Sequence, residues 1–221
     1  MRKILVSMAA LMAVVLTAGA ALADFSPKFS MELSDTKAKA NPDMSFHLEF
    51  DADDEEIGLF TAKMPKGFNI AADEDIADGT VIGAGEVTIQ AGLACRPGPE
   101  GQIPLSAPVT IPAEFEERDR TDEEADSGVH SVWFLNLEPA NRVRLLVTGS
   151  AKRGWTVSGA PDPSDNTCNP LEVDLTINGT ADDTPVITNP TKPGKYVFNA
   201  EIASQDSAAV AKFKHVVKIT K

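Results

Sequence analysis

The sequence predicts an all-β fold, a β-sandwich with Greek-key connections. Apolar residues recur at every second position over most of the chain, which is typical of strands with one buried face. Fifteen Pro and fifteen Gly punctuate these runs and mark turns between them. No window has the spacing of a convincing amphipathic helix. We therefore expect about nine or ten strands, arranged in two sheets that each have one dry face.

The alternation predicts strands over residues 28–34, 43–50, 57–64, 80–90, 129–137, 142–148, 171–177, 195–203 and 211–220. Pro65-Lys66-Gly67 stops the third of these. Gly83 and Gly85 in the fourth indicate a bulge or a close backbone approach. The acidic stretch 113–126 is too polar to dock a helical face, so a loop or one short helix is expected there.

Residues 1–23 have the three parts of a cleavable signal peptide. Arg2 and Lys3 supply positive charge, residues 5–16 are almost unbroken apolar, and Ala21-Leu22-Ala23 fits the small-x-small cleavage pattern. The apolar stretch is shorter than the ~20 residues that span a bilayer. The mature chain is expected to begin at about Asp24. We predict a protein that is secreted or on the cell-envelope exterior, in the periplasm if the source has an outer membrane.

The mature chain is strongly acidic. Because residues 1–23 carry two cations and no acid, removing them changes the net charge from −13 to −15. This charge argues against binding to nucleic acid and to anionic membranes, which attract basic surfaces. No cysteine lies near the cleavage point and no later apolar run is long enough to span a membrane. We therefore expect a mature chain without a transmembrane segment or a tether of its own.

Cys95 and Cys168 are the only cysteines. In an exported chain an even pair most simply forms one disulfide, with two free thiols as the alternative. A disulfide that closes the loop between Cys95 and Cys168 stabilises a fold by roughly 3–5 kcal/mol in the chain-entropy model.

No metal motif is complete. Residues 51–56 resemble the start of a Ca²⁺ loop, but the sixth and twelfth positions hold Glu56 and Ala62 where Gly and Glu are needed. Other acids would form a site only if the fold gathered them, and they are interpreted as solubilising loops; these are Asp73, Asp75, Asp78, Asp122, Glu123 and Asp126. The three histidines, His47, His130 and His215, lack metal-ligand spacing and are interpreted as hydrogen-bonded structural residues. We predict no bound metal and no cofactor.

No catalytic motif is present either. The chain lacks a Gly-x-Ser-x-Gly elbow, a Cys-His pairing and a phosphate-binding glycine loop. Glycosidase carboxylates need only geometry, so the sequence leaves them open. Trp133 is interpreted as core. Trp155, beside Lys152 and Arg153, either stacks on a sugar at the surface or packs inward, and the usual burial of Trp favours the second. We predict a protein that is not an enzyme.

Several segments resemble exported bacterial immunoglobulin-like β-sandwich proteins of uncharacterised function. The segments are Leu33-Ser-Asp-Thr-Lys-Ala-Lys-Ala-Asn-Pro-Asp-Met-Ser-Phe46, Met64-Pro-Lys-Gly-Phe68, Val81-Ile-Gly-Ala-Gly-Glu-Val87, Gly92-Leu-Ala-Cys95 and Pro193-Gly-Lys-Tyr-Val-Phe198. The last, followed by a lysine-rich strand, is similar to the closing hairpin of immunoglobulin-like domains. These are strand and turn motifs, so the resemblance implies a fold and carries over no functional residue.

We expect residues 24–221 to form a single domain, with two immunoglobulin-like modules split near 113–126 as the alternative. The functional prediction is a non-enzymatic, surface-associated or secreted binding or structural module, whose partner is an extracellular or cell-envelope protein or glycan. The alternatives are a carrier for a small lipid or glycan, and a hydrolase on a sandwich scaffold.

Overall fold

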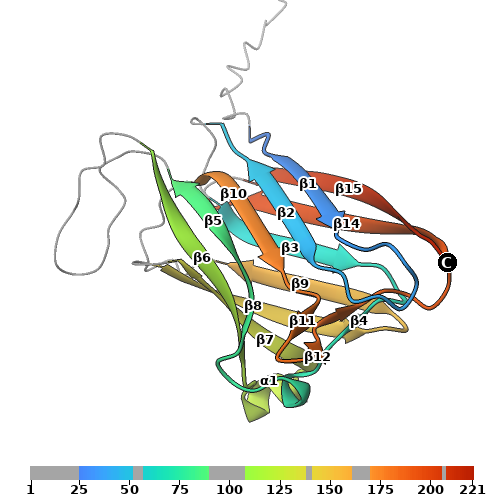
Figure 1. Cartoon of the computed structure of the whole chain (residues 1–221). Helices are drawn as coiled ribbons and strands as arrows, with labels where there is room; N and C mark the ends of the chain where they lie inside the picture. The colour runs from blue at the N-terminus through green and yellow to red at the C-terminus, as the bar shows by residue number, and fades with distance from the viewer. Residues whose placement is uncertain (1–24, 52–56, 90–107, 138–140, 161–169, 206–207) are drawn as a thin grey trace, which may run out of the picture.

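The computed structural model describes residues 25–51, 57–89, 108–137, 141–160, 170–205 and 208–221 (Figure 1). Its strands are β1 (Lys28–Leu33), β2 (Met44–Glu49), β3 (Ile57–Met64), β4 (Asn69–Ile70), β5 (Val81–Ile89), β6 (Val109–Arg118), β7 (Val129–Leu137), β8 (Asn141–Ser150), β9 (Gly154–Ala160), β10 (Pro170–Ile177), β11 (Thr180–Ala181), β12 (Thr184–Pro185), β13 (Ile187–Thr188), β14 (Gly194–Ser204) and β15 (Val210–Ile219). The described helices are a 3-10 turn, η1 (Asp73–Asp75), and α1 (Asp122–Asp126). The prediction of an all-β chain is confirmed.

Eleven strands form one antiparallel sheet in the order β1-β2-β10-β5-β6-β7-β8-β9-β3-β14-β15. The sheet curls into a near-barrel, with β1, β2, β10, β5 and β6 on one side and β3, β9, β8 and β7 behind them (Figure 1). The expected Greek-key sandwich of two sheets is not confirmed. A sandwich and a curled sheet both give each strand one dry and one wet face, so the alternation in the sequence does not distinguish them.

The first and last strands meet at a parallel seam. With eleven strands that are each antiparallel to the next, β1 and β15 must run in the same direction. They join just beyond β1, where Ala38 N–H donates to Thr220 O at 3.0 Å and Thr220 N–H donates to Thr36 O at 2.8 Å. Further along the seam the rings of Phe29 and Phe213 lie 5.4 Å apart. Backbone pairing at one end and aromatic packing along its length hold the near-barrel together.

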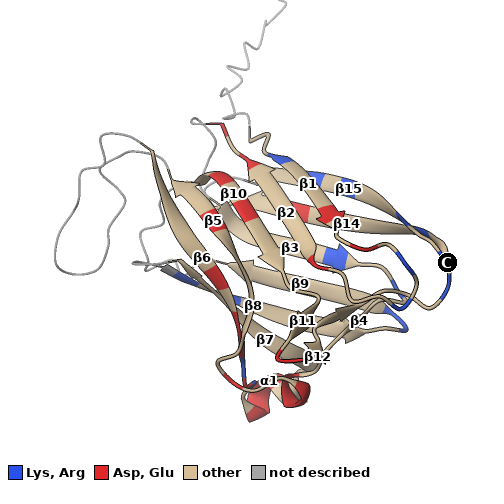
Figure 2. Cartoon of the chain, viewed as in Figure 1, with Lys and Arg blue, Asp and Glu red and all other residues tan. Residues whose placement is uncertain are grey.

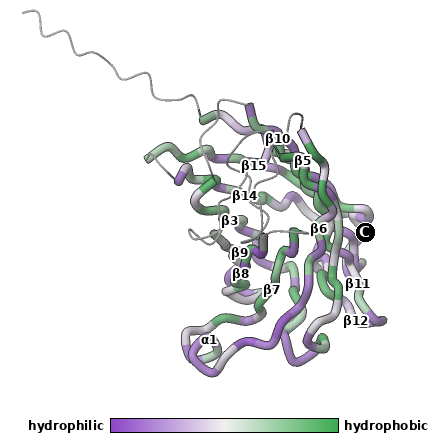
Figure 3. The backbone as a smooth tube through the Cα atoms, turned by 90° about the vertical axis from the view of Figure 1, so that its left-hand side faces the viewer, coloured by the Kyte–Doolittle hydropathy of each residue, from purple (hydrophilic) through white to green (hydrophobic). Residues whose placement is uncertain are grey.

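Inward-facing side chains from all around the sheet form one core. Hydrophobic and hydrophilic residues alternate along the strands (Figure 3). The buried members include Met31, Met44, Leu48, Val87, Phe115, Trp133, Val147, Trp155, Leu175, Phe198, Ile202 and Ile219. Trp133 and Trp155 are 1% and 3% exposed. The prediction that both pack inward is confirmed, and Trp155 is not the sugar-stacking surface residue that the alternative required.

The stretch 113–126 differs in part from its prediction. Its second half is the short helix α1, capped by Thr121, whose hydroxyl accepts from Glu124 N–H while Glu124 Oε2 accepts from Thr121 N–H. Its first half is strand, not loop, because Ala113 and Phe115 point inward with Glu117. A buried Glu at the third inward position disguised the alternation. β6 pairs with β5 and β7 in the same sheet, at the point where the two-module alternative would divide the chain.

Some predictions fall outside the described residues. The signal peptide at 1–23 and the disulfide partners Cys95 and Cys168 all do. Within the described part of the chain, no helix is long and apolar enough to cross a membrane.

Gly83 and Gly85 lie where β5 approaches β10 closely. A Cβ on Gly85 would overlap Asp174 O and lie 2.8 Å from Leu175 Cα, and one on Gly83 would overlap Thr176 O. The register between β5 and β6 also shifts between Val81 and Gly83. Both the close approach and the bulge that the sequence indicated are therefore present.

Gly85→Ala should lower the free energy of unfolding by about 1–3 kcal/mol, because the added methyl group meets backbone that cannot move aside independently. Urea denaturation followed by tryptophan fluorescence measures this. The matched control is Ala84→Ser, an exposed position on the same strand, which should stay within about 0.5 kcal/mol of the parent. Equal stability of Gly85→Ala and the parent would contradict the close approach.

Candidate functional site

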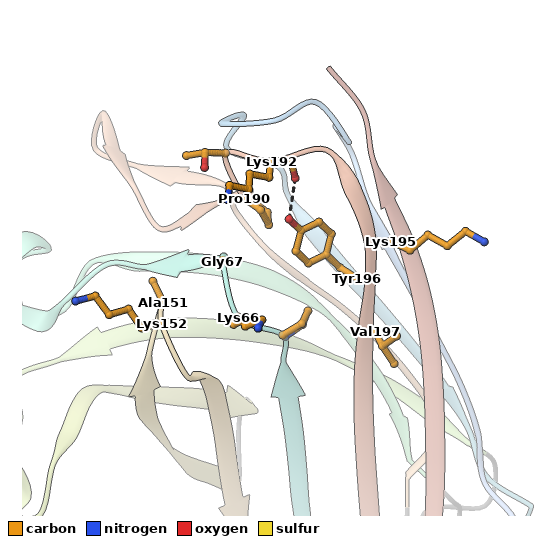
Figure 4. A pocket seen from close by; sticks show the side chains of 11 residues that line it. Lys66, Gly67, Ala151, Lys152, Pro190, Lys192, Lys195, Tyr196 and Val197 are labelled. Atoms are coloured by element: carbon orange, nitrogen blue, oxygen red, sulfur yellow. Dashed lines mark hydrogen bonds between the residues drawn. The ribbon is translucent and has the colours of Figure 1, made fainter.

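A surface pocket of about 530 Å³ lies at the end of the near-barrel where β3 and β8 end and β14 begins (Figure 4). This volume is typical of small-ligand sites. Three connections supply its walls: residues 65–67 after β3, the turn 151–152 between β8 and β9, and residues 190–192 leading into β14. Lys195, Tyr196 and Val197 from the start of β14 complete the lining.

Backbone hydrogen bonds fix the pocket walls to one another. Gly67 N–H donates to Ala151 O at 2.7 Å, which joins the first two walls. Gly67 has φ 103°, a left-handed conformation that favours glycine, and a Cβ there would lie 3.2 Å from Pro190 Cβ in the third wall. The third wall is also tied to the β1–β15 seam, because Asn189 Nδ2 donates to Asp35 O and Lys37 O, both at 2.9 Å. The pocket is therefore preformed by the closure of the sheet.

Tyr196 is the aromatic residue of the pocket lining. Its hydroxyl donates to Lys192 O at 2.7 Å, and its ring makes an edge contact with Phe68 at 5.6 Å. Phe68 is completely buried and its carbonyl accepts from Trp155 Nε1–H at 2.9 Å. Tyr196 thus rests on the core and holds one orientation.

Four lysines are among the lining residues: Lys66, Lys152, Lys192 and Lys195 (Figure 4). All four are exposed, and none forms an ion pair with a residue that the structure describes. No lining residue is acidic. In a chain of net charge −13, this is a local reversal of sign. The arrangement can bind an anion that also presents a surface to an aromatic ring.

The positive charge continues from the pocket over the outer face of β3, β14 and β15, which we call the lysine face. Its lysines are Lys63, Lys195, Lys212, Lys214 and Lys218, and Glu201 is the one acid among the outward positions of these three strands. Lys195 lies directly across from Lys218. Like charges placed opposite each other destabilise a sheet. An external anion would remove that repulsion.

Acidic side chains dominate the opposite face. Glu32, Glu49, Glu172, Asp174, Glu86 and Glu114 point outward from β1, β2, β10, β5 and β6, and α1 carries further acids (Figure 2). The near-barrel therefore separates its charges, with acids over one side and lysines over the other, where Lys63 pairs with Glu201 at 3.6 Å.

Two acids of the loops that the sequence offered as metal ligands, Asp73 and Asp78, are paired with arginines. Asp73 Oδ2 lies 3.1 Å from Arg120 Nε, and Asp78 Oδ2 lies 3.3 Å from Arg118. Burial raises the pKa of Asp73, but hydrogen bonds from Glu74 and Arg120, with the charge of Arg120, outweigh this effect and lower the pKa. In the described ranges, three or more potential metal ligands gather at one place, formed by His47, Glu172 and Asp174. None of the acids proposed from the sequence belongs to it.

The three histidines have different environments. His130 Nε2–H donates to Ile70 O at 3.0 Å, and its ring packs on Trp155 at 4.5 Å, as expected of a structural histidine. His215 takes an inward position on β15. His47 points outward between two carboxylates, and its hydrogen bonds to Asp174 and Glu49 raise its pKa.

The pocket lysines do not stand out as a site in the sequence. Two of the motifs that carry the immunoglobulin-like resemblance, Met64–Phe68 and Pro193–Phe198, supply Lys66, Lys195 and Tyr196. By themselves these motifs indicate only turns and strands. The available clue was two lysine-bearing Pro/Gly turns in an acidic chain, but nothing in the sequence places them side by side.

Glu117 is an inward-facing carboxyl that is 1% exposed. Burial raises its pKa to about 7, although the Ser131 hydroxyl, which donates to it at 2.8 Å, lowers it in part. Asp73 raises the pKa further by its charge. A carboxyl with such a pKa suits general acid chemistry, but this one is enclosed by the core and offers no substrate a route to it.

No family model matches this chain, and no curated protein sequence matches it.

Glu117→Gln should flatten part of the pH dependence of stability. The pKa of Glu117 is near 7 when folded and about 4.5 when unfolded, so folding favours its protonated form. In the parent this group costs stability progressively as pH rises from about 4.5 to about 7, by at most about 3 kcal/mol in all. Relative to the parent, Glu117→Gln should gain stability over that interval. Urea denaturation from pH 4.5 to 8 measures it.

The control for this comparison is Glu114→Gln, an exposed carboxyl on the same strand. Its stability should follow that of the parent across the same pH range. If Glu117→Gln differed from the parent by one constant amount at pH 4.5 and at pH 8, the buried carboxyl would not titrate as described.

Proposed function

We propose that this chain is a non-enzymatic exported binding module that holds an anionic glycan of the cell envelope in the lysine-lined pocket. The observation that supports this most directly is that four lysines line the pocket with Tyr196, without acidic partners among the described residues, in a strongly acidic chain. Export rests on the signal-peptide pattern of residues 1–23. The resemblance to exported immunoglobulin-like proteins rests on the turn and strand motifs alone.

The composition of the pocket supports a sugar that carries carboxylates or phosphates. Lysine ammonium groups pair with either anion, and the Tyr196 ring offers an apolar face against which a pyranose ring can pack. Thr191 contributes a hydroxyl to the lining. Apolar lipid would leave four lysines beside hydrocarbon, so the pocket favours a charged ligand over the lipid alternative.

Long-range electrostatics do not oppose this proposal. At 0.1 M salt, charges more than about 10 Å apart are largely screened, so a ligand in the pocket responds mainly to the lysines around it. Lysines on an edge strand also discourage pairing with other sheets, which is a purely structural reason for those on β15. That reason does not apply to Lys66, Lys152 and Lys192, which lie on turns.

The test is calorimetric titration of the purified chain with a short oligogalacturonate, a glycerol-phosphate oligomer and a neutral oligosaccharide. We expect one of the two anionic probes to bind, with an affinity that falls as salt rises. The combined variant Lys66→Gln, Lys152→Gln, Lys192→Gln should weaken binding by at least about tenfold, the loss of about 1.4 kcal/mol.

The matched control is Lys212→Gln with Lys214→Gln, which removes lysines of the lysine face outside the pocket. It should change the affinity by no more than about threefold, since screened surface charges contribute little. Failure of both anionic probes to bind, or an equal loss in the control, would overturn the proposed site.

A further inference from the structure

Four potential metal ligands form a square on the outer face of β2 and β10, on the acidic side of the near-barrel. His47 on β2 lies directly across from Asp174 on β10, and Glu49 lies directly across from Glu172. Neighbouring positions of this kind place side chains about 4.5–5.5 Å apart at Cβ. Both strands are flanked by further strands of the sheet, so their backbones are fixed.

The side chains converge in the structure. His47 Nδ1 lies 2.7 Å from Asp174 Oδ1, and Nε2 lies 3.3 Å from Glu49 Oε1. One ligand atom each from His47, Glu172 and Asp174 lies within 4.8 Å of the other two. Glu49 is partly neutralised by Lys28, whose Nζ lies 2.5 Å from Oε2. His47 and Asp174 are 36% and 58% exposed at their side chains, so an ion can reach them from solvent.

Both ring nitrogens of His47 face carboxylate oxygens, and a bound cation would account for this arrangement. A neutral imidazole carries one N–H, yet both ring nitrogens of His47 face carboxylate oxygens, which only accept. Either the ring carries a second proton or one nitrogen uses its lone pair on a cation. The second arrangement would let Asp174 and Glu172 bind the same cation.

We propose that His47, Asp174 and Glu172 bind one divalent transition-metal ion, with Zn²⁺ as the best-matched probe. A tetrahedral Zn²⁺ with bonds of about 2.1 Å places its ligand atoms about 3.4 Å apart, so the three groups need to close by little more than about 1 Å from their present separation. Rotation of exposed side chains supplies that movement. An imidazole in the set favours zinc and similar ions over Ca²⁺ and Mg²⁺, which prefer oxygen alone.

This inference does not rest on the proposed glycan site. The metal ligands lie on β2 and β10, and the lysine-lined pocket is built from residues that belong to neither strand. Metal and anionic ligand can therefore be tested separately.

Calorimetry of the full chain without a histidine tag, with free thiols blocked by iodoacetamide, should show saturable binding of one Zn²⁺. Replacing Zn²⁺ by Co²⁺ should give a visible absorption band that reports inner-sphere imidazole and carboxylate ligands. His47→Gln and, separately, Asp174→Asn should each weaken Zn²⁺ binding by on the order of 10- to 100-fold. Both positions are surface-exposed, and an unchanged melting temperature of the metal-free variants confirms that they fold.

The matched control is Glu86→Gln on β5, which removes a carboxylate directly beside Asp174 but outside the ligand group. It should weaken Zn²⁺ binding by less than about threefold, because it contributes only a screened surface charge. The proposal is overturned if the parent shows no saturable binding, if His47→Gln binds as well as the parent, or if Glu86→Gln loses as much affinity as His47→Gln.

Discussion

The odd number of strands in the sheet imposes a constraint on which the remaining structure depends. The sheet has eleven strands, each antiparallel to the next, so β1 and β15 run in the same direction. The sheet therefore cannot close by continuing its antiparallel hydrogen-bonding pattern. It closes through a short parallel bridge at Lys37 and Thr220, supplemented by Phe29 against Phe213. Without that seam the inward faces of β1 and β15, with Met31 and Ile219, would be open to water.

The seam also places the lysine-lined pocket. Asn189 donates to two carbonyls of the turn after β1, so the wall that carries Pro190 and Lys192 is anchored to the closure itself. The other walls rest on Phe68, Tyr196 and Trp155, which belong to the core. Rigid walls lower the entropic cost of binding, which suits a binding role better than an arrangement of free loops would.

The curled sheet gives the two outer faces opposite charge. Along the sequence, lysines and acidic residues are mixed, and the net charge of the chain is strongly negative. Strand order then collects acids over β2, β10 and β5 and lysines over β3, β14 and β15. The proposed anionic ligand and the proposed metal ion would thus each meet a surface of the opposite sign.

The sequence by itself determined the strand class, most strand positions, the inward orientation of Trp133 and Trp155, and the close approach at Gly83 and Gly85. These follow from alternation and from glycine, which act over a few residues. Only the tertiary structure decided that one sheet curls on itself, that Glu117 completes an inward row, and that Lys66, Lys192 and Tyr196 line one pocket. The same holds for His47 and Asp174, which are distant in sequence and adjacent in the sheet. The pairing of strands that are distant in sequence depends on the whole core. The alternation of residues within one strand does not determine which strand lies beside it.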